Sequence, residues 1–395
     1  MFSFSTISIT HSRYADFIER TAENDPQIRL TPNAEASPYA RCFAIFGLQL
    51  LREIEKLESG ADRWASVIRD DLDKVRHERT TAGADLAFDK PYLQLLTFSL
   101  SSMAILNRLD RDPFADHVAP LLSANIEADL RRAGVHKGKA QSGNLSMFMA
   151  ILLLHARDWL GIDDGGQIEH WQAFHLKSMN QFGFWGKTSS ISHLQFQNGY
   201  HQYEIFQYLR SDLPLWDKVA DNVALLADHE GHFSPYPGGG GCYDYDAIFL
   251  ITGAGKAAID RHRDLLIRTA KTILNEQNPD GGFCESHLIR PRSFENLSRA
   301  LSHAFAAEGK ARIERIRYAL SLQRSCHNRI DTHWSQYSRE WGESNLWDSW
   351  FRMLTLARID VALNPEAIKR WGFIDYPGIG YHKLLSRYNV SEGDE

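Results

Sequence analysis

The segment YDYDAIF contains two carboxylates spaced two residues apart, Asp244 and Asp246, next to the aromatic ring of Tyr245. An acid that protonates an unactivated alkene must stay protonated in a dry pocket, where aromatic faces stabilise the cation that forms. The apolar residues that follow Asp246 provide part of that setting. We therefore predict Asp246 as a proton donor, with Asp244 and Tyr245 beside it.

Both acids also have a structural interpretation. Asp244 would cap the start of a helix by accepting hydrogen bonds from free backbone N–H groups. Asp246 would be the buried partner of an arginine such as Arg292 or Arg299, because a buried charge needs a counter-charge. The sequence favours neither interpretation over the other.

A second polar group lies in LQFQNGYHQYEIF, where Asn198, His201, Tyr203 and Glu204 follow one another closely. Removing a proton next to a carboxylate requires that the charge of the carboxylate be masked, while Tyr or His acts as base and acid. Toroidal polysaccharide lyases use a similar set. If Asn198 caps a helix, His201 lies one turn further on and Tyr203 points elsewhere. These residues predict chemistry on a sugar acid, with a satisfied core histidine as the alternative.

Tryptophan and acidic residues gather between positions 331 and 352. Tryptophan faces can stack on pyranose rings, and paired carboxylates are the catalytic groups of glycoside hydrolases. Packing within the last pair of helices is the alternative interpretation of the tryptophans. The predicted substrate-binding residues of this group are His333, Trp334, Glu343, Trp347, Asp348 and Arg352.

Metal binding is only weakly indicated. Asp228, His229 and His232 form a DHxxH run, but Gly231 marks a helix end that explains these residues equally well. The four glycines at 238–241 lack the Lys and Ser/Thr of a phosphate-binding loop and predict a flexible lid or tight packing. We therefore predict no metal and no cofactor.

These candidates recur at related positions along the chain. Seven times, a turn-rich polar or aromatic stretch leads into an apolar helix, with starts 46 to 54 residues apart. This period accommodates two helices and their connections, so each unit is predicted as a helical hairpin. The predicted starts lie near Tyr39, Tyr92, Leu145, Gly199, Tyr245, Leu297 and Leu346. Polar residues predicted at or near their N-caps are Asn144, Asn198, Asp244, Asn296 and Asn345.

Amphipathic segments separate these apolar helices, with apolar residues at i, i+3, i+4 and i+7 as expected for helices packed on one side. The recurring helices are apolar all round, which suits a buried inner ring. No strand pattern is strong enough to predict a sheet. The predicted outer segments include 61–79, 112–134, 168–181, 216–229 and 262–277. Alternating inner and outer helices predict an all-α fold, a single α/α toroid of six or seven hairpins.

The composition is that of an ordinary globular protein, with 43% hydrophobic and 24% charged residues. A formal charge of −6 over 395 residues gives no basic surface, which argues against nucleic acid as a partner. The chain starts without signal-peptide features, and its longest apolar run, 147–154, is too short to cross a bilayer. Four widely separated cysteines favour reduced thiols and a cytoplasmic location. The oligomeric state stays open.

Two stretches carry a resemblance to a known superfamily. AKTILNEQNPDGGFCES (270–286) resembles the repeat of terpenoid cyclases and protein prenyltransferases, and GHFSPYPGGGGCYDYDAIFLI (231–251) is similar to the stretch of squalene–hopene-type cyclases that ends in their DxDD motif. The resemblance implies an α/α toroid. It also implies that Asp246 matches the proton-donating middle acid and Asp244 the first, while Ala247 stands in place of the third.

The expected organisation is an N-terminal extension or first outer helix over 1–36, a toroid over 37–380 and a tail over 381–395. The leading expectation is acid-initiated cyclisation or isomerisation of an isoprenoid-like small molecule, with Asp246 as the acid. The alternatives are a uronic-acid lyase or glycoside hydrolase, and a toroid that binds a partner without catalysis.

Overall fold

The computed structural model describes residues 4–24, 26–109, 114–211, 213–288, 293–324, 329–331, 336–338 and 342–378. Within these ranges the chain is mostly α-helical, with two short antiparallel pairs of strands. The all-helical class predicted from the sequence is thus confirmed. The pairs join β1 (Ala22–Asn24) to β2 (Gln27–Ile28) and β3 (Arg329–Asp331) to β4 (Gln336–Ser338).

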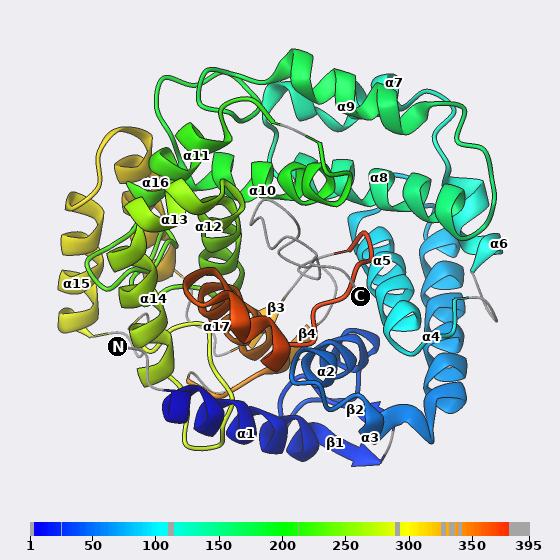
Figure 1. The fold of residues 1–395 in the computed structure, drawn as a ribbon, viewed down its shortest axis with the longest axis horizontal. Coiled ribbons are helices and arrows are strands. Elements are labelled where there is room, and N and C mark those ends of the chain that lie inside the picture. The colour runs from blue at the N-terminus through cyan, green and yellow to red at the C-terminus, as the bar shows by residue number, and fades with distance from the viewer. Residues whose placement is uncertain are drawn as a thin grey trace.

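Six helices occupy the middle of the molecule and contact one another in a closed cycle (Figure 1). Each contacts the next one along the chain, and the last contacts the first. The six are α2 (Pro38–Leu50), α5 (Lys90–Ile105), α8 (Ser142–Asp158), α10 (His193–Tyr208), α12 (Gly241–Gly253) and α17 (Leu346–Leu363). They correspond to six of the seven predicted inner helices. The largest shift is at α10, which begins at His193 rather than near Gly199.

Neighbouring inner helices meet with their N-terminal halves together. Helices that run in the same direction need a returning segment between them, which explains why an outer helix follows each inner one. The contacts that join these halves pair Tyr39 with Pro91, Phe43 with Trp347, Asn144 with His201 and Tyr200 with Tyr245. As a result, the starts of these helices lie at one end of the cycle.

The remaining helices lie around the inner six (Figure 1). The segment predicted as one helix over 112–134 is broken instead, because Pro120 has no N–H group for a helix interior. The outer helices are α1 (Phe4–Thr21), α3 (Glu55–Glu58), α4 (Ala61–Thr81), α6 (Ala115–Val118), α7 (Ile126–Ala133), α9 (Gln167–Ser178), α11 (Trp216–Ala224), α13 (Lys256–Arg261) and α14 (Arg263–Asn275). Three short 3₁₀ helices are η1 (Ala119–Leu121), η2 (Val135–Lys137) and η3 (Pro365–Arg370).

The seventh predicted inner helix lies outside the cycle. Helix α15 (Phe294–Phe305) packs against α16 (Gly309–Arg324) and leaves Phe294 and Phe305 exposed. Its buried residues form one narrow stripe, whereas the inner helices are buried almost all round. The prediction of an inner helix near Leu297 is therefore wrong.

Capping explains where several inner helices begin. The side chains of Ser37, Asp89, Ser192 and Asn345 each accept a hydrogen bond from the backbone N–H three residues later. Of the predicted caps, Asn345 is therefore confirmed. The N-cap residues of the other four helices are Gln141, Ser192, Gly240 and Ser293. Asn144, Asp244 and Asn296 lie near these caps in the first turn, whereas Asn198 lies further inside its helix.

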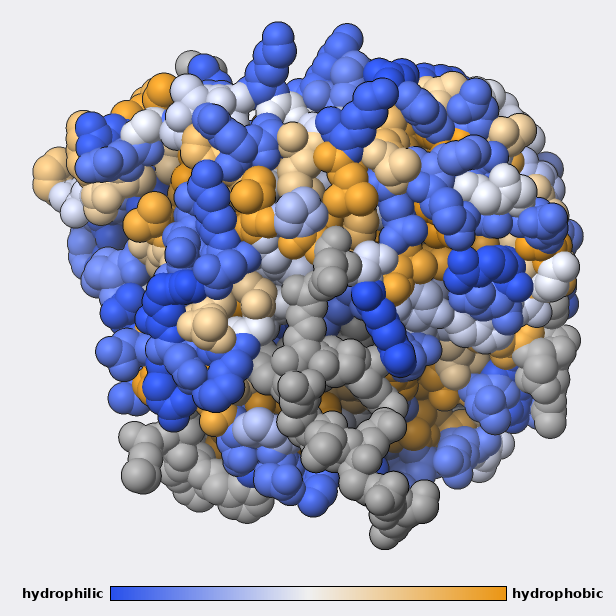
Figure 2. All heavy atoms as spheres, turned by 45° about the horizontal axis from the view of Figure 1, so that its top comes forward, coloured by the Kyte–Doolittle hydropathy of each residue, from blue (hydrophilic) through white to orange (hydrophobic). Residues whose placement is uncertain are grey.

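Apolar side chains fill the space between the helices and form one continuous core. On the face of the molecule in Figure 2, hydrophobic residues are interspersed among hydrophilic ones. None of the helices in the described part of the chain combines the length and the apolar character needed to span a bilayer.

The contact between α8 and α10 depends on a glycine. A Cβ atom added at Gly143 would overlap the backbone carbonyl of Asn198, which cannot move without shifting α10. At Gly47 in α2, the nearest atoms are side-chain ends, 2.7 Å from Ile18 Cδ1 and 2.7 Å from Tyr14 Oη. These ends can rotate away more easily than a helix backbone can move.

We expect Gly143→Ala to lower the free energy of unfolding by about 1–3 kcal/mol, the usual cost of overpacking. Gly47→Ala should cost less, because both variants gain the same helix propensity while only Gly143 faces a backbone. Urea unfolding of both variants measures the difference. An equal loss of unfolding free energy in both variants would show that the close contact between α8 and α10 does not require a glycine at position 143.

Candidate functional site

Helix α12 turns its two acids to different surroundings. Residues two apart on a helix point about 200° apart around its axis, so Asp244 and Asp246 cannot share one environment. Both are buried, with exposed fractions of 0% and 2%. Asp244 meets cations, and Asp246 meets aromatic rings and another carboxylate.

Asp244 is the centre of a buried ion-pair cluster. Its Oδ2 atom lies 3.0 Å from Nδ1 of His232 and accepts a hydrogen bond from Nη1 of Arg352. Its Oδ1 atom accepts a hydrogen bond from the backbone N–H of Phe233 (2.8 Å). Nε2 of His232 lies 3.0 Å from Oε1 of Glu276, whose Oε2 lies 3.5 Å from Nη2 of Arg352. Two cations and two anions therefore balance one another between α12, α17, the C-cap residue of α14 and the loop that carries His232.

The four-glycine segment closes over this cluster. Gly239 has φ +88°, and a Cβ there would lie 2.6 Å from Nη2 of Arg352 and 2.7 Å from Nδ1 of His232. Only glycine fits both the backbone conformation and this close approach. The neighbouring carbonyl of Gly238 accepts a hydrogen bond from Arg352 (3.0 Å). Of the two predictions for this segment, the contacts of Gly239 match tight packing.

The cluster shifts the protonation of its members in compensating directions. Burial alone would lower the pKa of His232. The carboxylates of Asp244 and Glu276 raise it by more, so the pKa of His232 is raised to about 10. Burial raises the pKa of Asp244, but His232 and Arg352 lower it below its ordinary value. Burial raises the pKa of Glu276, but Arg352 and His232 again lower it. All four groups are thus charged at neutral pH.

Asp246 lies on the other side of α12, close enough for its charge to act on Tyr200, Tyr243 and Tyr245. The ring of Tyr200 lies 5.7 Å from that of Tyr245 and 5.2 Å from that of Phe249, in edge-to-face arrangements. The carboxyl group of Asp246 makes no hydrogen bond or ion pair with any residue that the structure describes. Burial raises the pKa of Asp246 well above its ordinary value, and the carboxylates of Glu204 and Asp244 raise it further. The direction of this shift favours the protonated form of the acid.

The predicted residue His201 is buried on α10, next to Asn144 near the start of α8. Its Nε2 lies 2.8 Å from the side-chain amide of Asn144, and its Nδ1 is buried without a hydrogen-bond partner in the described part of the chain. Burial lowers the pKa of His201 to about 3, and the nearby Lys90 contributes in the same direction. Burial also lowers the pKa of Lys90 to about 8. His201 is therefore a neutral imidazole with an amine in its neighbourhood.

Two other residues predicted with His201 are engaged elsewhere. The side-chain amide of Asn198 donates to the backbone carbonyl of Lys139 (3.2 Å), which ties α10 to the segment before α8. The hydroxyl of Tyr203 donates to the carbonyl of Gly183 (2.8 Å), and its ring packs against Trp216 on the outer side of α10. Tyr203 is thus not brought together with Asp246.

The start of α17 supplies three further predicted residues. The ring of Trp347 lies 5.2 Å from Phe43 and 4.8 Å from Phe351, as in a packed core. Asp348 accepts a hydrogen bond from the side chain of its own helix cap, Asn345 (2.6 Å). Arg352, one turn further on, belongs to the Asp244 cluster.

The other predicted sugar-binding residues are not gathered at this end of α17. Glu343 accepts a hydrogen bond from Asn33 (2.8 Å) near the N-terminal strands. His333 and Trp334 lie outside the described residues. Arg299 pairs with Glu295 on the outlying α15, so it is not the partner of Asp246, and Arg292 lies outside the described residues.

Lys90, Glu276 and the ion-pair role of His232 are not among the features predicted from the sequence. The DHxxH run groups His232 with Asp228 and His229, but His229 is exposed, and Asp228 instead accepts hydrogen bonds from the backbone N–H groups of Glu230 and His232. Glu276 directly precedes the QNPDGG turn of the repeat, and this position could have marked it as a candidate site residue. Lys90 is the first residue of α5, which the polar helix starts could have indicated.

A scan against protein-family models and a search of curated proteins give no match to this chain. The assignment of a function therefore rests on the residues and their geometry.

Breaking the cluster at its arginine should destabilise the protein strongly. Arg352→Met leaves Asp244 and Glu276 buried without a full counter-charge, and such losses cost about 3–5 kcal/mol. The matched control is Arg299→Met, which removes an exposed pair with Glu295 and should cost less than about 1 kcal/mol. Urea unfolding measures both, and similar small losses would contradict the role of Arg352.

The raised pKa of His232 predicts a dependence of stability on pH. Its contribution is full below the unfolded pKa near 6.5 and is lost as pH rises through the folded value of about 10. Over that window the free energy of unfolding should fall by at most about 1.4 kcal/mol per pH unit from this group. The lowered pKa values of Asp244 and Glu276 predict the opposite loss below about pH 4.

Denaturant unfolding between pH 6 and 10 tests this dependence. His232→Gln should flatten the slope, whereas His229→Gln removes an exposed histidine outside the cluster and should leave the slope unchanged. An unchanged slope in His232→Gln would show that this group does not hold its extra proton in the folded state.

Proposed function

We propose that this chain is an enzyme that cyclises or isomerises an isoprenoid-like substrate, with Asp246 as the proton donor. The observation that supports it most directly is the placement of Asp246. Its carboxyl group is buried beside Glu204 and aromatic rings, with no hydrogen bond or ion pair to any described residue. Because no described residue holds this carboxyl group by a hydrogen bond or ion pair, its proton is available to a substrate that enters the interior.

We also propose that the six inner helices and their outer partners form an α/α toroid. The closed cycle of contacts and the meeting of helix starts at one end support this arrangement. The N-terminal ends of helices carry partial positive charge, so they favour anionic groups at that end. A substrate with an anionic headgroup would place that group at the helix starts and its apolar chain further inside.

The chemistry follows from the surroundings of Asp246. The proton passes from the carboxyl group to one carbon of an alkene, a C–H bond forms, the π bond breaks, and the neighbouring carbon becomes a cation. The faces of Tyr200, Tyr245 and Phe249 stabilise that cation. Loss of a proton from the rearranged cation restores a double bond and ends the reaction. Asp244 cannot take the same role, because it is held ionised by His232 and Arg352.

The second candidate is acid–base chemistry on a sugar acid. One observation favours it: neutral His201 contacts Asn144 and lies near the cation of Lys90. Lys90 would mask a uronate carboxylate while His201 moves the proton. Neither Tyr203 nor Trp347 takes part in this version, since both are packed elsewhere.

Asp246→Asn tests the first candidate, because the amide has the same shape and cannot donate the proton. The assay uses geranylgeranyl diphosphate, which has an anionic headgroup, and squalene, which has none, as probes in D₂O, with mass spectrometry of the products. The wild-type enzyme should place one deuterium in each product molecule, and Asp246→Asn should abolish turnover while keeping its melting temperature within a few degrees. His201→Ala should stay active on the same probes.

The outcomes separate the candidates. Isoprenoid turnover in Asp246→Asn that equals wild type would overturn the proton-donor role. Activity on polyuronate that is lost in His201→Ala and retained in Asp246→Asn would support the lyase. A protein with no turnover of either class, whose two variants change only in melting temperature, would support a binding role.

A pH profile gives a readout that a purely structural role of Asp246 would not change. The protonated form is the active one, so activity should fall as pH rises through the pKa of Asp246. Glu204→Gln removes a charge that raises the pKa of Asp246, so the alkaline fall should move to lower pH. An alkaline limb that does not move in Glu204→Gln would contradict the coupling of these two carboxyl groups.

A further inference from the structure

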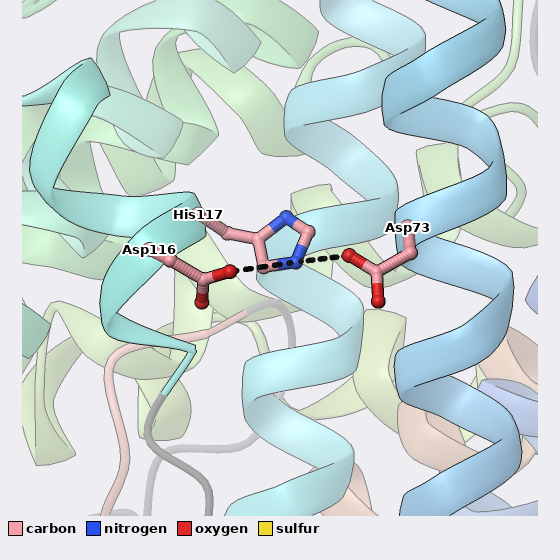
Figure 3. Close-up of side chains that lie close together, drawn as sticks. All are labelled: Asp73, Asp116 and His117. Carbon is pink, nitrogen blue, oxygen red and sulfur yellow. Dashed lines mark ion pairs between the residues drawn. The ribbon is translucent and has the colours of Figure 1, made fainter.

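A second group of ionisable side chains lies on the outer layer, away from α12. Asp73 comes from α4, and Asp116 and His117 come from the short helix α6. Within the described residues, they are the one group of three or more His, Cys, Asp or Glu whose possible ligand atoms all lie within 4.8 Å of one another. Figure 3 shows the imidazole of His117 between the two carboxylates.

The distances between these atoms suit a small ion. Nε2 of His117 lies 3.0 Å from Oδ1 of Asp73 and 3.9 Å from Oδ2 of Asp116. Four ligands bound tetrahedrally at about 2.0–2.2 Å would have their atoms about 3.3–3.6 Å apart. The observed separations lie on either side of that value. The carboxylates are 53% and 62% exposed, so small rotations can bring them to it.

A buried nitrogen aimed into the group is an independent observation. His117 is only 1% exposed, and its Nε2 atom has no hydrogen-bond partner in the described part of the chain, although Oδ1 of Asp73 lies 3.0 Å away as an ion-pair partner. Leaving a buried polar atom unpaired costs free energy, so such atoms are rare. A positive ion between Nε2 and the two carboxylates would satisfy this atom and both acids together.

The other ring nitrogen of His117 is already held in place. Nδ1 lies 2.9 Å from the hydroxyl of Tyr92, a fully buried residue of the inner helix α5. Histidines that bind metals almost always donate their second N–H to a neighbouring group, which fixes the ring and its tautomer. With Nδ1–H donated to Tyr92, the lone pair of Nε2 points between the carboxylates.

We propose that Asp73, Asp116 and His117 bind one divalent transition-metal ion, with zinc as the best match. One imidazole nitrogen and two carboxylate oxygens form a mixed set that suits zinc and its neighbours rather than calcium, which takes six to eight oxygens. Water would complete the coordination on the exposed side. Arg76 lies 3.9 Å from Oδ2 of Asp116, close enough to pair with that carboxylate when the ion is absent.

The test uses the full chain, stripped with a chelator and titrated with Zn²⁺ alone in competition with a chromophoric chelator. Wild-type protein should bind one equivalent tightly. Asp73→Asn and Asp116→Asn should each weaken binding by at least tenfold, and both replace exposed side chains, so they should fold. Tyr92→Phe should weaken binding by about 10-fold through loss of ring orientation.

Asp221→Asn is the matched control. Asp221 also pairs with a histidine, His262, at 2.8 Å, but no third ligand group joins them among the described residues, so this variant should keep wild-type affinity. The proposal is overturned if wild-type protein binds zinc no more tightly than the Asp73→Asn/Asp116→Asn double variant. It is also overturned if Asp221→Asn weakens binding as much as Asp73→Asn does.

Discussion

Whether a buried carboxyl group in this protein is ionised depends on which groups replace the water around it. A carboxylate removed from water must either meet cations and hydrogen-bond donors or take up a proton. Helix α12 contains both solutions two residues apart. Asp244 has His232, Arg352 and a backbone N–H around it, and Asp246 has aromatic rings and the second carboxylate of Glu204. The inner helices can hold these acids only because the surrounding elements supply one environment or the other.

The two environments have different consequences for the protein. The Asp244 cluster links α12, α14 and α17 with a glycine-rich loop, so it fixes these elements against one another. The carboxyl group of Asp246 has no such links among the described residues, as the proposed role of proton donor requires. Because both acids are on one helix, the cluster also helps to set the position of Asp246 relative to Tyr200 on α10. Stability and proposed reactivity therefore share the same helix.

The outer layer also places a histidine next to two carboxylates, here at the surface of the protein. His117 is anchored through Tyr92 to the inner helix α5, and it faces exposed acids from two outer elements. An ion bound there would tie α4 and α6 together at the point where Pro120 interrupts the outer segment. This would couple the two layers at the start of α5, where Tyr92 lies in the first turn.

The sequence by itself determined the helical class, the period and the positions of six inner helices, because apolar periodicity and capping are local properties. Asn345 could be identified as a cap for the same reason. Only the tertiary structure decided which polar residues meet. Asp244 and Asp246 look alike in the sequence, and the difference between them comes from His232, Arg352 and Glu204, which packing brings from distant segments. The seventh repeat shows the same limit: its spacing fits the others, but burial against α16 places it outside the cycle.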